Sequence, residues 1–169
     1  LINGSLVGLG GFFGPILPNL VMPVARLYMR KMVGHLVLDA ESDALNKILD
    51  KAAESGEQLN LNLLGEAVLG EEEAKSRAER TLKLIRNPRV TYVSVKASSK
   101  VAQLNPWDID GSVERLKERL RPLYQAAADR TDKVFINMDM EEYHDLHLTI
   151  RLFKELLSEP EFLTLDAGI

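Results

Sequence analysis

The 169-residue chain contains no cysteine, one tryptophan and few aromatic residues, which make up 6% of it. The absence of cysteine excludes a disulfide-stabilised scaffold, a thiolate metal site and a cysteine nucleophile. Positive charge is not in excess, because 21 Lys and Arg against 25 Asp and Glu give a net charge of −4. Such a balance gives no indication of nucleic-acid binding. With 46% hydrophobic and 27% charged residues, the composition is that of a globular domain.

An uninterrupted hydrophobic helix is also missing from the chain. Residues 5–24 are apolar, but three prolines would disturb a membrane-spanning helix there. The first charged residue is Arg26, so this segment lacks the basic region that precedes the apolar core of a secretory signal. We expect residues 1–56 to form an apolar, Gly- and Pro-rich segment with a helical lead-in, followed by the main domain over residues 57–169.

Apolar patterns of strand and helix periodicity alternate along the rest of the chain. Strands are expected over residues 59–64, 90–96 and 134–139, with the start of another at 166–169. Helices are expected over residues 24–38, from Ser42 to a stop at Gly56, over 71–86, from Ser112 with a kink or break at Pro122, and between 139 and Pro160. In the last helix, the residues expected to face inward are Tyr143, Leu146, Ile150, Phe153 and Leu157.

This alternation predicts an α/β fold with parallel strands and right-handed crossovers. The first two strands begin 31 residues apart, at residues 59 and 90, which matches the roughly 31 residues per unit of a (β/α)8 barrel. A complete barrel needs roughly 250 residues. We therefore expect a partial (β/α)8 barrel, consisting of the first three βα units after a helical lead-in.

Each predicted strand is polar on one side. Ser94 and Lys96 share a side of the second strand, and Asn137 and Asp139 share a side of the third. Helices should cover the apolar side, so the polar side would line a barrel interior or a crevice. Together with Glu66, which follows the first strand, Lys96 and Asp139 are the ionisable groups at the C-terminal strand ends, where ligand sites of α/β folds lie. We expect them to pair with one another or with a ligand.

Two other interpretations of these residues stay open. The three ionisable groups could form only a stabilising network in a non-catalytic α/β interaction module. Alternatively, a metal-assisted hydrolase or lyase could use a cluster formed by Asp139, Glu141, Glu142, His144, Asp145 and His147. A charged, solvated helix start explains that cluster more simply, so no metal ligand is assigned. Trp107 is expected to anchor a loop.

Three segments resemble the first strand-end motifs of the proline dehydrogenase family. They are residues 63–67 (LLGEA), 93–99 (VSVKASS) and 136–142 (INMDMEE). The resemblance extends from about residue 26 to residue 169 and is strongest to the proline dehydrogenase module of bifunctional proline utilization A proteins. Residues 29–34 (MRKMVG) resemble the helical lead-in of that module.

The resemblance implies a distorted (β/α)8 barrel that binds FAD, oxidises L-proline to 1-pyrroline-5-carboxylate and passes the electrons to a membrane quinone. Carried over by motif, Asp139 is the catalytic aspartate, which also contacts the cofactor, and Met140 lies against the flavin. Lys96 would contact the substrate and the flavin edge. Glu66 would form a supporting ion pair with a substrate-binding arginine. Asn62 stands where some relatives have aspartate.

The resemblance also implies a cytoplasmic protein with peripheral contact to the inner membrane face. A pyrroline-5-carboxylate dehydrogenase module can follow in the same chain of such proteins. The family's later strands and its arginine pair are absent from these residues. We therefore expect the 169 residues alone to bind FAD weakly, to be inactive, and to self-associate through an open strand edge.

Overall fold

The computed structural model describes residues 11, 18–34, 43–64, 68, 70–102, 104–105, 107–140 and 142–169. The chain divides into two compact units, residues 1–45 and 46–169. The main described element of the first unit is α2 (Pro18–Val33), and the division falls within α3 (Asp43–Glu54). In the described part of the chain, no helix is long and apolar enough to cross a membrane.

Helix α2 begins six residues before the predicted start at residue 24 and contains Pro23. Proline is tolerated in the first turn of a helix, where an N–H group would lack an intrahelical partner, and Pro18 occupies that position. The predicted end at residue 38 lies outside the described residues. Helix α3 ends at Glu54, just before the predicted stop at Gly56, which has a φ of 73° that favours glycine.

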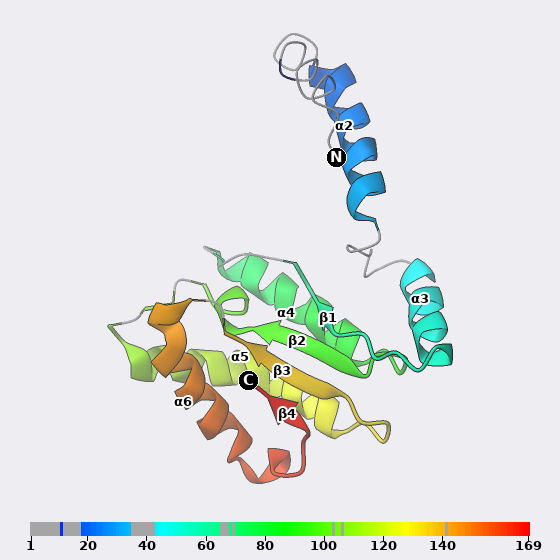
Figure 1. The fold of residues 1–169 in the computed structure, drawn as a ribbon. Coiled ribbons are helices and arrows are strands. Elements are labelled where there is room, and N and C mark those ends of the chain that lie inside the picture. Colours follow the sequence, from blue (N-terminus) through cyan, green and yellow to red (C-terminus); the bar gives the residue numbers. More distant parts are fainter. Residues whose placement is uncertain are drawn as a thin grey trace. The chain divides into compact units, whose positions relative to one another are not determined.

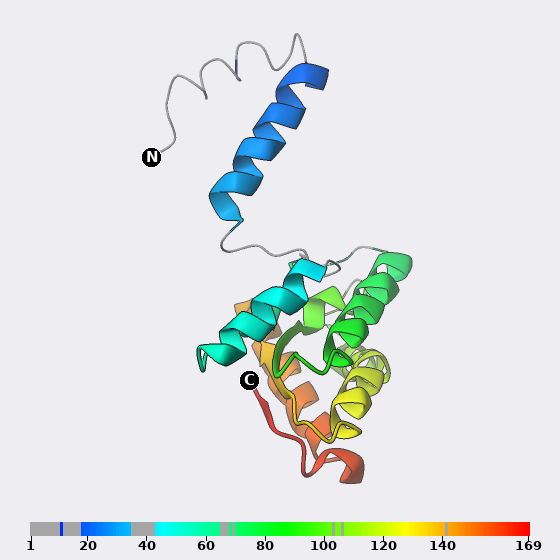
Figure 2. The same ribbon diagram turned by 90° about the vertical axis from the view of Figure 1, so that its right-hand side faces the viewer.

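Four parallel strands form the sheet of the second unit, in the order in which they occur along the chain. They are β1 (Leu61–Asn62), β2 (Tyr92–Lys96), β3 (Phe135–Asp139) and β4 (Ala167–Gly168). Helices α4 (Glu71–Ile85), α5 (Ile109–Ala128) and α6 (Leu146–Leu157) pack side by side over one face of the sheet (Figures 1 and 2). Single 3-10 turns are η1 (Ala97–Ser99), η2 (Tyr143–Asp145) and η3 (Pro160–Phe162). This arrangement confirms the predicted α/β fold and is part of a (β/α)8 barrel.

The hydrophobic core lies between the sheet and these three helices. Val93 and Ile136 of the central strands are fully buried. The helices contribute equally buried side chains, among them Ile85, Leu116, Leu120, Leu123, Leu152 and Leu156. Burying one such side chain contributes about 1.5–3 kcal/mol to folding, so this layer fixes the sheet on which the polar side chains stand.

Helix α5 differs from the prediction at both its start and its middle. Asp108 accepts a hydrogen bond from Gly111 N at 3.0 Å and caps the helix, which therefore starts before Ser112. The helix continues through Pro122, so of the predicted kink or break the break is wrong. Pro122 is exposed, whereas Leu120 and Leu123 are fully buried, and core packing on that side holds the helix together.

The inward face of α6 is also not the predicted one. Tyr143 is 88% exposed, and the buried positions are Leu148, Thr149, Leu152 and Leu156. The remaining predicted residues, such as Leu146 and Phe153, are only half-buried. Because α6 is apolar around more than half of its circumference, periodicity alone did not distinguish the stripe that meets the core.

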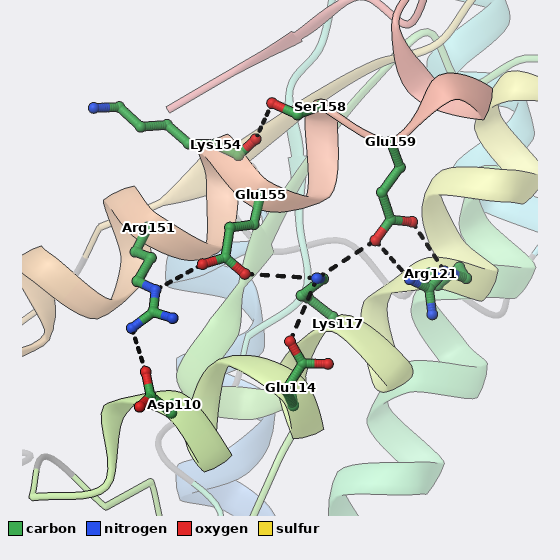
Figure 3. Close-up of polar contacts among 9 residues, drawn as sticks. All are labelled: Asp110, Glu114, Lys117, Arg121, Arg151, Lys154, Glu155, Ser158 and Glu159. Carbon is green, nitrogen blue, oxygen red and sulfur yellow. Dashed lines mark hydrogen bonds and ion pairs between the residues drawn. The ribbon is translucent and has the colours of Figure 1, made fainter.

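Ion pairs join the outer surfaces of α5 and α6 (Figure 3). Lys117 Nζ lies 3.4 Å from Glu114, 3.5 Å from Glu155 and 3.7 Å from Glu159. Arg151 contacts both Asp110, at 2.5 Å, and Glu155, at 2.6 Å, and its hydrogen bond lowers the pKa of Glu155. Such partly exposed pairs contribute modestly to stability, but the network holds the two helices in one alignment.

Candidate active site

Polar side chains stand in rows on the sheet face opposite the helices. The register aligns Asn62, Ser94 and Asn137 with Gly168 across all four strands. One row further along, at the C-terminal ends of β2 and β3, Lys96 lies opposite Asp139. The predicted polar side of the strands is therefore present in the structure, and it brings Lys96 and Asp139 together.

The carboxylate of Asp139 is held by two amides. Asn62 Nδ2 donates to Asp139 Oδ2 at 3.0 Å, and Asn137 Nδ2 donates to Asp139 Oδ1 at 2.6 Å. Sequence reasoning missed both asparagines as partners of Asp139 and expected ionisable partners instead. The shared strand side of Asn137 and Asp139 was the available signal for one of them. Glu66 lies outside the described residues.

The backbone around Lys96 is fixed by a tight turn. Ser99 Oγ donates to the carbonyl of Lys96 at 2.9 Å, and Lys100 N donates to the carbonyl of Ala97 at 3.0 Å. These bonds end β2 at Lys96 and start the 3-10 turn η1, which leaves the Lys96 side chain partly exposed at the sheet edge.

A second lysine, Lys100, lies next to this edge but is only 3% exposed. Burial, followed by the positive charges of Arg77, Arg80 and Lys96, lowers the pKa of Lys100 to about 8. Sequence reasoning did not single out this residue, because a lone lysine after a strand gives no signal of burial. The C-terminal end of β2 thus concentrates positive charge.

Exposed apolar side chains lie beside the polar rows. Met140, which directly follows Asp139, is 36% exposed, and Leu64 after β1 is also exposed. Trp107, in the loop between η1 and α5, is 95% exposed, so the expectation that it anchors a loop is wrong. A flat aromatic cofactor ring needs apolar contacts next to polar ones, and Met140, which follows Asp139 in the chain, fits that requirement.

Those residues considered for a metal site that the structure describes do not converge. Among the residues that the structure describes, no group of three or more His, Asp or Glu side chains could hold a metal ion. His144 Nε2 lies 3.3 Å from Asp145 Oδ1, and His147 is exposed on α6. Glu141 lies outside the described residues. The described geometry therefore gives no support to the metal-assisted alternative.

The family model described as proline dehydrogenase matches residues 44–169. The chain belongs to the proline dehydrogenase family. A solved structure of proline utilization A (PutA) from Corynebacterium freiburgense is 60% identical over 99% of this chain and superposes with a TM-score of 0.79. PutA from Bdellovibrio bacteriovorus, inactivated by N-propargylglycine, is 32% identical over 69% of the chain with a TM-score of 0.61. No curated protein matches.

These comparisons confirm the resemblance to proline dehydrogenase that the three strand-end motifs carry. The chain spans 17% of the length of the Corynebacterium protein and 14% of the Bdellovibrio protein. Of the three function classes considered, family membership favours the proline dehydrogenase over the metal-assisted enzyme and the interaction module.

Proposed function

We propose that the protein, at its full natural length, catalyses the FAD-dependent oxidation of L-proline to 1-pyrroline-5-carboxylate. The observation that carries the proposal is the placement of Lys96 opposite Asp139 at the ends of neighbouring parallel strands. A zwitterionic amino acid needs a cation for its carboxylate and an acceptor for its amine. This pair supplies one of each, and membership of the proline dehydrogenase family supports the same substrate.

In this proposal Lys96 binds the substrate carboxylate and Asp139 accepts a hydrogen bond from the substrate amine. The amine of proline must lose a proton before its carbon can release a hydride, and a fixed carboxylate orients the amine for that step. When bound, FAD supplies the hydride acceptor. Met140 and Asp139 are the described residues that would hold its ring, and Glu66 would pair with an arginine of the substrate site.

The wider context of the reaction is part of the same proposal. We infer that the electrons pass to a membrane quinone, that a pyrroline-5-carboxylate dehydrogenase module accompanies this one, and that the protein is cytoplasmic with peripheral membrane contact. The similarity to PutA proteins supports these inferences. In the described residues, β4 pairs on one side with β3, and an unpaired strand edge supports self-association of the 169 residues alone.

The proposal is tested with Asp139→Ala in the full-length protein, measured as proline-dependent quinone reduction. We expect turnover to fall by about 100-fold or more, the range typical of lost acid–base groups, with an unchanged circular dichroism spectrum. The matched control is Asp166→Ala, because Asp166 is exposed and pairs with the exposed Lys133 at 3.3 Å. Normal turnover of a folded Asp139→Ala variant would overturn the assignment.

A further inference from the structure

We propose that Asn62 and Asn137 are positioning residues that hold the carboxylate of Asp139 in one orientation. The inference rests on the proposed function, in which Asp139 contacts the substrate amine. It concerns two residues that touch neither the reacting atoms nor the cofactor in that proposal, and that act through Asp139.

Both oxygens of the partly exposed Asp139 carboxylate accept a hydrogen bond from a side-chain amide. Each oxygen of Asp139 accepts from a different amide, Oδ2 from Asn62 at 3.0 Å and Oδ1 from Asn137 at 2.6 Å. One bond holds a single oxygen, around which a carboxylate can still rotate. Two bonds from different directions fix the plane of the group, which is what orienting a substrate amine requires.

The bond from Asn62 depends on a small residue between the two strands. Asn62 lies on β1 and Asp139 on β3, so their side chains meet across β2, and adjacent strands are roughly 4.8 Å apart. Ser94 occupies β2 in register with Asn62 and is itself almost fully buried. Its hydroxyl accepts a bond from Asn60 at 3.0 Å. A larger side chain at this position would separate Asn62 from Asp139.

The chemistry of the donors matches that of a carboxylate, and the charged residue in register with Asp139 on the neighbouring strand is Lys96. A side-chain amide nitrogen only donates hydrogen bonds, and an ionised carboxylate only accepts them. Two amide donors, one to each oxygen, therefore match the anion and leave further lone pairs on both oxygens for a substrate amine. A second carboxylate at position 62 would instead place two negative charges together, and the pair would retain a proton.

This reasoning makes Asn62→Asp the diagnostic substitution, because aspartate keeps the size of asparagine but replaces a donor by a charge. In the full-length protein, we expect the acidic limb of the kcat profile to move to higher pH by about one unit in this variant. In Asn62→Ala and Asn137→Ala, we expect kcat to fall about tenfold with little change in the KM for proline.

Asn60→Ala is the matched control, because Asn60 stands on the same side of the same strand segment but bonds Ser94 instead of Asp139. Its kcat and pH profile should remain those of the unmodified protein.

The inference is wrong if Asn62→Ala, Asn137→Ala and Asn62→Asp all retain normal kcat and pH profiles while Asp139→Ala is inactive. It is also wrong if all asparagine variants, including Asn60→Ala, lose activity equally without a pH shift, since this indicates a merely structural role. Normal turnover in Asp139→Ala would instead overturn the proposed function itself.

Discussion

The ring of Phe135 occupies the space that a side chain at Gly168 would need. A Cβ atom on Gly168 would lie 2.8 Å from Phe135 Cζ and 3.3 Å from its Cε1, and 3.5 Å from Asn137 Oδ1. Phe135 cannot easily retreat, because its ring packs edge-to-face on Tyr92 with the ring centroids 5.0 Å apart. The absence of a side chain at Gly168 therefore lets β4 approach β3 beside the asparagine that contacts Asp139.

Gly168→Ala should consequently weaken the pairing of β4 with β3. We expect the free energy of unfolding to fall by about 1–3 kcal/mol, the usual effect of overpacking, as measured by urea denaturation. Phe135→Leu should restore part of the loss in the double variant, because it removes the ring that the new methyl group meets. Strictly additive effects of the two substitutions would contradict direct contact between them.

Lys100 should make stability depend on pH in the alkaline range. Its pKa is lowered from 10.5 to about 8 in the folded protein, so between these values the unfolded chain binds more protons and stability rises with pH. Below pH 8 the cost of the buried charge is present in full. Lys100→Met should therefore raise the free energy of unfolding at pH 7 by roughly 1–3 kcal/mol and flatten its rise towards pH 10.

The measurement is urea denaturation at several pH values between 7 and 10. Lys83→Met provides the control, since Lys83 is an exposed lysine of α4. An equally steep pH dependence in Lys100→Met and the unmodified protein would show that Lys100 is not the group responsible.

Arg130 fastens the loop between α4 and β2 to the loop between α5 and β3. Its Nη1 donates to the carbonyls of Ile85, Asn87 and Val90 at 2.7, 3.2 and 2.8 Å. Arg130→Met removes these donors and should lower the free energy of unfolding by about 2–3 kcal/mol. Arg130→Lys should recover only part of the loss, because an ammonium lacks the planar set of donors. Arg86 is exposed, so Arg86→Met is the control and should change the free energy of unfolding little. Equal losses in Arg86→Met and Arg130→Met would contradict the role of Arg130 in joining the two loops.

Tyr124 carries a polar atom that the core does not satisfy. Its hydroxyl is buried without a hydrogen-bond partner among the described residues, and burial raises the pKa of Tyr124. Its ring packs edge-to-face on Phe162 at 6.0 Å. Tyr124→Phe keeps this packing and should stabilise the protein by about 1 kcal/mol, seen as a higher Tm. A lower Tm would indicate that the hydroxyl has a partner.

Much of the fold was predictable because local patterns determine it. The alternation of strand and helix periodicity along the chain predicted a parallel α/β fold. The positions of Lys96 and Asp139 at the ends of predicted strands placed both residues at one edge of the sheet. Local patterns were misleading where the outcome depends on packing against other elements, such as which face of a helix is buried. They predicted a kink or break at Pro122, where α5 continues unbroken, and an inward Tyr143, which is exposed.

The sequence by itself determined the order of the strands and helices, which side of the strands is polar, and the family to which the chain belongs, since all of these follow from short-range spacing and motifs. The tertiary structure alone decided which groups hold Asp139. Asn62 and Asp139 are 77 residues apart in the sequence, and their hydrogen bond exists because two parallel crossovers place β1 and β3 on either side of a strand with a small serine between them. A contact of that kind depends on register and side-chain size across strands, which no local pattern records.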